Sequence, residues 1–379
     1  MKILVCGAGV AGLATAANLA RTGHDVTLVE LAADVRAGGS PVDIRGDALP
    51  IAEKMGILEK LRDVQLFSTA SLQYVDANGK VIARLPHDVV ADSADDIEIA
   101  REDLLPILVG LLPDETDVRF RTTIESVRDH GDHVAVTLTD GHQANYGLVV
   151  GTDGARSTVR RMVFGPAEDY VSFLGIYGGF AYLGKHDTDG LPSQMYNTPG
   201  KNVGIYYYRD RALGVFMFRS PLLDYDYRDP KAQRAVIAEA LQGGDWRVPE
   251  IVAAAQKDEN LYFDMACQVK MDGWHRGRIV LVGDSAHCAS PLSGRGTSLA
   301  LSGAHFLADE LNNAADGTLD EALDRYEARQ RPYATKAQEG VGPASDMVLP
   351  ATQEALEARN ALFRSMGADP TQPGAASSG

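Results

Sequence analysis

The first thirty residues constrain the fold of this chain more than any other stretch. They read KILVC, then GAGVAG, then an alanine-rich run that stops at Gly23, and then DVTLVE. The two short apolar runs predict buried strands, and the alanine-rich run between them predicts a helix that ends at a glycine. A strand, a helix and a second strand in this order are typical of a parallel sheet covered by helices.

The glycine spacing in this unit predicts a bound dinucleotide. Gly7, Gly9 and Gly12 form the pattern G-x-G-x-x-G, and Glu30 ends the second strand. The glycines let a pyrophosphate approach the backbone, the helix N-terminus offers free N–H groups, and the acid can accept from ribose hydroxyls. The motif alone does not separate FAD from NAD. The candidate cofactor-binding residues here are Gly7, Gly9, Val10, Ala11, Gly12, Glu30 and Leu31.

A second stretch, GDSAHCASPLSGRGTSLAL at residues 283–301, has a comparable order. Asp284 follows the apolar run RIVLV, and a proline and several glycines separate it from the next helix. Ligands of α/β proteins bind at the carboxyl ends of parallel strands, so this acid can accept from hydroxyl groups while the helix N-terminus faces an electron-rich ring edge. FAD combines a pyrophosphate, ribityl hydroxyls and such a ring. The residues assigned to it here are Asp284, Pro291, Gly294, Gly296, Thr297 and Ser298.

The rest of the chain predicts a second domain inserted into the first. Residues 168–270 hold strand-like runs rich in aromatic and β-branched residues and one amphipathic helix. The predicted fold class is α/β: a Rossmann-like FAD-binding domain with an inserted, mainly antiparallel β-sheet substrate domain and a C-terminal helix. The helix in EALDRYEARQRPYATKAQE is expected to be disturbed at Pro332. The predicted divisions are 1–72, 98–166 and 273–318 for the FAD-binding domain, 73–97 (a hairpin) and 167–272 for the substrate domain, 319–368 for C-terminal helices, and 369–379 for a flexible tail.

Charge and composition narrow the partners. Acids outnumber bases by 52 to 36, a formal net charge of −16, which disfavours nucleic acid and anionic membrane as partners. The three cysteines lack metal-ligand spacing, so we expect no metal and a reduced, cytoplasmic setting. Glycines break the apolar run after Lys2, so a signal peptide is not expected, and no apolar stretch reaches the roughly 20 residues of a membrane helix. We expect a monomer or a weak dimer.

Three motifs in this order resemble those of the class A flavoprotein monooxygenases, which share the para-hydroxybenzoate hydroxylase fold. GAGVAG with Glu30 is similar to their nucleotide fingerprint, GTDGARSTVRR to their Asp-Gly motif, and GDSAHCASPLSGRG to their Gly-Asp motif. The resemblance runs over nearly the whole chain. Within the family, GGSPVDIRG and the chain length look most like the tetracycline-inactivating monooxygenases and related antibiotic-tailoring hydroxylases.

The resemblance assigns roles to individual positions. It implies that Asp284 binds the ribityl chain and that Arg101 contacts FAD. It also implies a loop around the flavin and its nicotinamide partner, and an Asp-Gly turn that supports the flavin site. Arg295 stands where many relatives carry a smaller or neutral polar residue, and no role follows for it. The residues that the loop and the turn contribute are Arg36, Asp43, Arg45, Asp153 and Arg156.

The resemblance implies a reaction as well. NADPH or NADH would reduce non-covalently bound FAD, O₂ would form a flavin C4a-hydroperoxide, and one oxygen would pass to an aromatic or polycyclic phenolic or enolic molecule such as an antibiotic or aromatic polyketide. The alternative is an FAD-binding oxidoreductase of the same fold without oxygenation: a reductase, an oxidase or a protein with structural FAD. The flavin carries the chemistry in the first case, so no catalytic side chain is assigned, and His287 is interpreted as structural.

Overall fold

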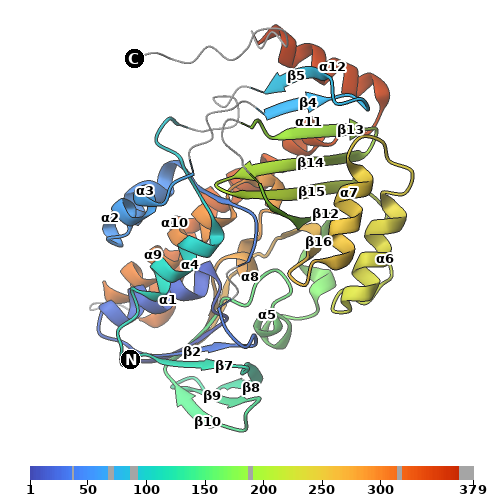
Figure 1. The fold of residues 1–379 in the computed structure, drawn as a ribbon. Helices are drawn as coiled ribbons and strands as arrows, with labels where there is room; N and C mark the ends of the chain where they lie inside the picture. Colours follow the sequence, from blue (N-terminus) through green and yellow to red (C-terminus); the bar gives the residue numbers. More distant parts are fainter. Residues whose placement is uncertain (36–37, 67–71, 86–92, 187–190, 314–317, 367–379) are drawn as a thin grey trace. The chain divides into compact units, whose positions relative to one another are not determined.

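The computed structural model describes residues 1–35, 38–66, 72–85, 93–186, 191–313 and 318–366. The chain divides into two compact units, each assembled from separate segments of the sequence (Figure 1). The first unit comprises Met1–Gln65, Asp95–Ser172 and Cys267–Val341, and the second comprises Leu66–Ala94, Phe173–Ala266 and Gly342–Gly379. Within the described ranges, no helix is both long and apolar enough to cross a membrane.

A six-stranded sheet forms the centre of the first unit. Its strand order is β17-β18-β11-β1-β2-β7, and all neighbours are parallel except β17 and β18. Buried apolar side chains run along β1, β11 and β18, as expected of strands covered on both faces. The strands are β1 (Lys2–Cys6), β2 (Asp25–Glu30), β7 (Asp117–Phe120), β11 (Leu148–Gly151), β17 (His275–Arg276) and β18 (Ile279–Leu281).

Helices and two small sheets complete the first unit. Helix α1 (Val10–Arg21) packs against α9 (Gly296–Asn312) and α4 (Arg101–Val109), and α9 packs against α10 (Leu319–Glu339). Strands β8, β9 and β10 form a separate antiparallel sheet. The other elements are α2 (Leu49–Lys54), α3 (Leu58–Asp63), α5 (Thr158–Val163), α8 (Asp284–His287), β3 (Val42–Ile44), β6 (Ile97–Ile99), β8 (Ile124–Asp129), β9 (Val134–Leu138) and β10 (Gln143–Tyr146).

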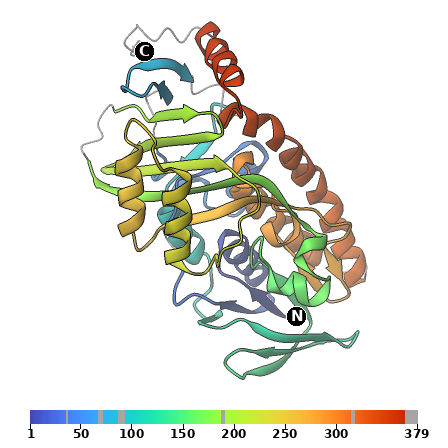
Figure 2. The same ribbon diagram turned by 90° about the vertical axis from the view of Figure 1, so that its right-hand side faces the viewer.

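The second unit is built on a seven-stranded sheet of order β16-β12-β15-β14-β13-β4-β5. Helices α6 (Pro230–Ala240) and α7 (Val248–Lys257) lie across one face of it (Figure 2), where Ile251 of α7 shares a buried cluster with Phe216 and Phe218 of the sheet. Helix α12 (Gln353–Ser365) packs beside β5 and β13, and α11 (Val341–Val348) precedes it. The strands are β4 (Leu72–Val75), β5 (Val81–Leu85), β12 (Val171–Lys185), β13 (Gln194–Thr198), β14 (Lys201–Tyr208), β15 (Arg211–Arg219) and β16 (Tyr262–Val269).

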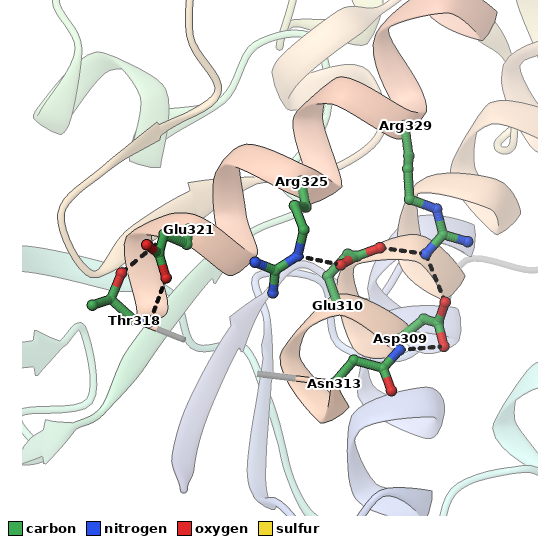
Figure 3. A network of polar contacts seen from close by, with 7 residues as sticks. All are labelled: Asp309, Glu310, Asn313, Thr318, Glu321, Arg325 and Arg329. Atoms are coloured by element: carbon green, nitrogen blue, oxygen red, sulfur yellow. Dashed lines mark hydrogen bonds and ion pairs between the residues drawn. The ribbon is translucent and has the colours of Figure 1, made fainter. Parts of the chain in front are cut away.

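Ion pairs join the end of α9 to α10 (Figure 3). Arg329 donates through Nη1 to Asp309 at 2.6 Å and to Glu310 at 2.5 Å, and Arg325 donates to Glu310 at 2.8 Å. The guanidinium of Arg329 also lies 4.3 Å from the ring centroid of Phe306. Glu310 is nearly buried, so it depends on these two arginines to offset its desolvation.

Helix α10 differs from the sequence-based expectation at Pro332. The helix is continuous from Leu319 to Glu339, although proline removes one backbone hydrogen bond. Gln338, after the proline, donates to the carbonyl of Val269, and two side chains before the proline also bind other parts of the first unit. Gln330 donates to the carbonyl of Leu299, and Arg331 donates to the carbonyl of Met271. These tertiary contacts hold the helix together across the position where its own sequence weakens it.

The core of the first unit contains a histidine without polar partners. His287 is 2% exposed, and its ring centroid lies 4.7 Å from that of Trp274. Neither ring nitrogen has a hydrogen-bond partner among the described residues. Burial lowers the pKa of His287 to about 4, from an ordinary value of 6.5. The folded protein therefore holds this imidazole neutral at pH values where the unfolded chain protonates it.

We expect this histidine to make the fold less stable in acid. The pKa is lower in the folded state, so stability falls as pH decreases from about 6.5 towards 4, by up to about 3 kcal/mol. His287→Leu should flatten the pH dependence of the free energy of unfolding in that window, as measured by urea titration at several pH values. His142→Leu, at an exposed position, is the control and should leave it unchanged. Equal slopes for wild type and His287→Leu would contradict the assignment.

Candidate functional site

The first glycine motif packs directly on the Asp-Gly motif. Gly7 has a φ of +109°, and a Cβ there would lie 2.7 Å from the carbonyl oxygen of Thr152. The hydroxyl of Thr152 donates to the carbonyls of Cys6 and Gly7 at 2.8 and 2.9 Å. At Gly12 a Cβ would overlap the Gly7 carbonyl oxygen. Only glycine therefore lets the first turn of α1 lie against the ends of β1 and β11.

The Gly-Asp motif packs against the same first turn of α1. Gly283 has a φ of +72°, and a Cβ on it would lie 2.7 Å from the Cβ of Ala11 in α1. Arg160 of α5 is 1% exposed and donates to the carbonyls of Ser285 and Ala155, which ties the Asp-Gly segment to the Gly-Asp segment. The structure thus brings together three motifs that are more than a hundred residues apart in sequence.

The N-terminus of α1 is open to a ligand. Within the described part of the chain, no side chain caps it, and nothing lies within 4 Å of the position that a Cβ of Gly9 would occupy. Glu30 ends β2 nearby and accepts the N–H of Ala8 through Oε2 and the N–H of Ala32 through Oε1, both at 2.7 Å. Each carboxylate oxygen keeps a second lone pair for a hydroxyl group. The site fits a pyrophosphate and a ribose, as the glycine spacing predicts.

Asp284 begins α8, and two residues separate it from the end of β18. Its side chain is exposed to solvent, yet desolvation by the surrounding protein raises its pKa. The two observations agree for a carboxylate that is recessed between protein atoms and still accessible from one side. The positive charge of Arg101 acts on it and opposes the rise. Arg101 begins α4 and donates to the carbonyl of Gly38 at 3.2 Å. Arg101 therefore lies close both to the loop GGSPVDIRG and to Asp284 of the Gly-Asp motif.

The loop before the short 3-10 helix η1 (Gly46–Ala48) reaches the N-terminus of α9. The backbone N–H of Arg45 donates to the hydroxyl of Ser298 at 3.0 Å, and its guanidinium pairs with Asp43 at 2.6 Å. A Cβ at Gly294 would lie 3.4 Å from that guanidinium. Of the side chains that the structure describes, none caps α9, whose preceding residue is Arg295. The free N–H groups of this helix therefore remain available to an acceptor on a ligand.

Asp153 is bonded to its own turn. Its carboxylate accepts the backbone N–H groups of Thr158 and Val159 at 2.7 and 3.1 Å and the hydroxyl of Ser157. It thereby satisfies donors at the N-terminus of α5, and burial raises its pKa.

Ser290, three residues after His287, has a φ of +81° although it is not glycine. Backbone strain of this kind concentrates at functional sites.

The predicted residues fall into three groups. Arg36 lies outside the described residues. Arg156 is half-buried in the Asp-Gly turn, and Leu31 is 64% exposed. Asp43 and Arg45 lie in and directly after β3, and Arg101 begins α4, which follows β6. The others lie at the carboxyl ends of strands of the six-stranded sheet or on the segments that follow those strands. Sequence reasoning missed Thr152 and Arg160, although both stand inside or beside the quoted motif GTDGARSTVRR.

The site lacks the donor set of a metal centre. No group of three or more His, Cys, Asp or Glu side chains within the described ranges could hold a metal ion. What the site offers instead is free backbone N–H groups at two helix ends and carboxylate acceptors at Glu30 and Asp284. That combination suits a ligand with a pyrophosphate and several hydroxyl groups.

Comparison with known proteins gives matches over most of the chain. Residues 1–176 and 229–341 match a family described as "FAD binding domain". A flavin-dependent monooxygenase from an unknown prokaryotic organism is 36% identical over 369 residues, which cover 95% of this chain and 94% of that protein. Among solved structures, tetracycline destructase Tet(51) has a TM-score of 0.83 and 32% identity, with 99% of both chains covered.

A second destructase, Tet(55), has a TM-score of 0.81 and 34% identity, covering 96% of this chain and 95% of its own. The two structures and the sequence relatives agree with the three motifs on the same conclusion. This chain belongs to the FAD binding domain family and is an FAD-dependent monooxygenase of class A, near the tetracycline-inactivating enzymes.

Proposed function

We propose that the protein uses NADPH or NADH and O₂ to hydroxylate a polycyclic phenolic or enolic small molecule of the antibiotic or aromatic polyketide type. The observation that carries this proposal is the convergence of two uncapped helix ends, Glu30 and Asp284 on one edge of the sheet. When bound there, FAD supplies the redox chemistry, from hydride acceptance to activation of O₂.

The chain's own residues would then bind and orient this cofactor. The N–H groups at the start of α1 would hold the pyrophosphate, and Glu30 would accept from the adenosine ribose. Asp284, with Arg101 beside it, would accept from the ribityl hydroxyls. The N–H groups at the start of α9 would face the flavin ring, held in place by the bond from Arg45 to Ser298.

One face of the sheet in the second unit has a surface that suits an aromatic substrate. Its strand register puts Phe180, Val215, Gly204 and Met195 in one row, on the face opposite α6 and α7. Phe180, Val215 and Met195 are only partly buried, and Gly204 carries no side chain. The thioether of Met195 covers Gly204, so the row presents an apolar surface, which suits a flat polycyclic molecule. A tetracycline is the first probe, because Tet(51) and Tet(55) are tetracycline destructases.

We expect Asp284→Ala to weaken FAD retention. A hydrogen bond to a charged group contributes about 1.5–3 kcal/mol, so the affinity should fall about 10- to 100-fold. Flavin absorbance after extensive dialysis, followed by titration of the apoprotein with FAD, measures the effect. Asp63→Ala, at an exposed position of α3, is the matched control. Flavin occupancy that is equal in the two variants would remove Asp284 from the cofactor site.

We also expect substrate to control reduction. Oxidation of NAD(P)H by the purified protein should be slow alone and clearly faster with a tetracycline or a related phenol, and the product should be heavier by one oxygen atom. Stopped-flow absorbance of flavin reduction, with and without the ligand, and mass spectrometry of the product are the measurements. Fast reduction without any ligand, or unmodified ligand with stoichiometric H₂O₂ across a phenolic panel, would favour an oxidase or reductase instead.

A further inference from the structure

The second unit contains a cavity that the proposed reaction does not use. Its volume is about 430 Å³, within the range of small-molecule sites. It lies between the ends of β4 and β13 and the first three turns of α12, where Figure 1 shows this helix beside the sheet edge. Val75, Tyr196 and Leu356 give it an apolar wall.

A buried cation lies behind the polar wall of this cavity. Arg359 is 6% exposed and stacks 4.0 Å above the ring centroid of Tyr74. Its guanidinium donates to the side-chain oxygens of Asn197 and Asn360 and to the carbonyl of Met347. Among the described residues no carboxylate pairs with it. A buried charge without a counter-ion is unfavourable, so the region as a whole favours a nearby anion.

Asn360 directs a free donor at the cavity. It is 5% exposed and lines the cavity wall. Its Oδ1 accepts from Arg359 at 2.8 and 3.1 Å, which turns the Nδ2 amide group away from the guanidinium. No described residue accepts from that amide group. Arg364 also lines the cavity, and among the described residues only one of its nitrogens is bonded, to the carbonyl of Ile82 at 3.1 Å.

Two acids at the rim limit the charge of the ligand. Asp76 accepts the backbone N–H groups of Asn78 and Lys80, and Glu357 accepts from the side chain of Gln353. Both face the cavity and repel a polyanion such as a phosphate ester. A single carboxylate can bind at the donor-rich wall while the remainder of the molecule stays apolar.

We propose that this cavity is a second ligand site, which binds a small monocarboxylic acid with an apolar or aromatic body. The carboxylate accepts from the Nδ2 group of Asn360 and from Arg364, in the field of Arg359. The body packs against Val75 and Leu356. This site is made of second-unit residues alone and is independent of the residues proposed to hold FAD.

The test uses the full chain with FAD bound and two probes of equal shape, 1-naphthoate and the neutral 1-naphthamide, in isothermal titration calorimetry. We expect naphthoate to bind with a stoichiometry of one and naphthamide at least about tenfold more weakly, since it lacks the charge-assisted bonds. Asn360→Asp keeps an acceptor for Arg359 but removes the donor and adds a negative charge. It should weaken naphthoate at least about tenfold.

Two further variants keep the test decisive. Arg364→Met, at an exposed position, should weaken naphthoate several-fold even if Asn360→Asp does not fold. Lys257→Met removes a cation from α7, outside the cavity, and should change nothing. The proposal is overturned if naphthoate fails to saturate the protein, if naphthamide binds equally well, or if the variants bind naphthoate like the wild type. In that last case naphthoate occupies another site. None of these readouts depends on turnover, so failure of the proposed reaction would leave them intact.

Discussion

The contact between Gly12, the Gly7 carbonyl and Thr152 is the constraint on which the rest of the site depends. A side chain at Gly12 would overlap that carbonyl, so α1 can begin at the end of β1 only with glycine there. The Thr152 hydroxyl fills the remaining space and bonds the carbonyls of Cys6 and Gly7. Because β11 lies beside β1, this one contact sets the Asp-Gly turn against the dinucleotide turn, and the free N–H groups of α1 point outward from it.

Helix α9 is held at both ends, by a hydrogen bond at its N-terminus and by ion pairs at its C-terminus. At its N-terminus it is bonded to the loop of Arg45 through Ser298, a neutral hydrogen bond beside an ion pair. At its C-terminus Asp309 and Glu310 bind two arginines of α10. Packing of α1 against α9 also holds α9 in place. Rigid placement of the helix matters because a helix end contributes to binding only when its N–H groups already point at the ligand.

The sequence predicted the family, the fold class and much of the local structure. Strand, helix and strand in the first thirty residues are confirmed as β1, α1 and β2, because close glycine spacing and apolar runs are local signals. Thr152 and Arg160 could not be found in this way, since their roles consist of contacts with carbonyls far along the chain. The continuity of α10 through Pro332 escaped for the same reason: contacts of Gln330 and Arg331 outweigh the local signal. The roles of the individual cofactor residues stay predictions.

Helix capping links the site to the stability of the fold. Thr318 and Thr352 directly precede α10 and α12 and cap them with their side chains, whereas no described side chain caps α1 or α9. A side-chain cap stabilises a helix by about 1 kcal/mol, so α1 and α9 each lack a contribution of about this size to the free energy of unfolding. A ligand that accepts from those N–H groups binds only the folded state. The free energy of unfolding then increases with the logarithm of the ligand concentration. The open helix ends that allow the cofactor to bind therefore also make the first unit depend on that cofactor for its full stability.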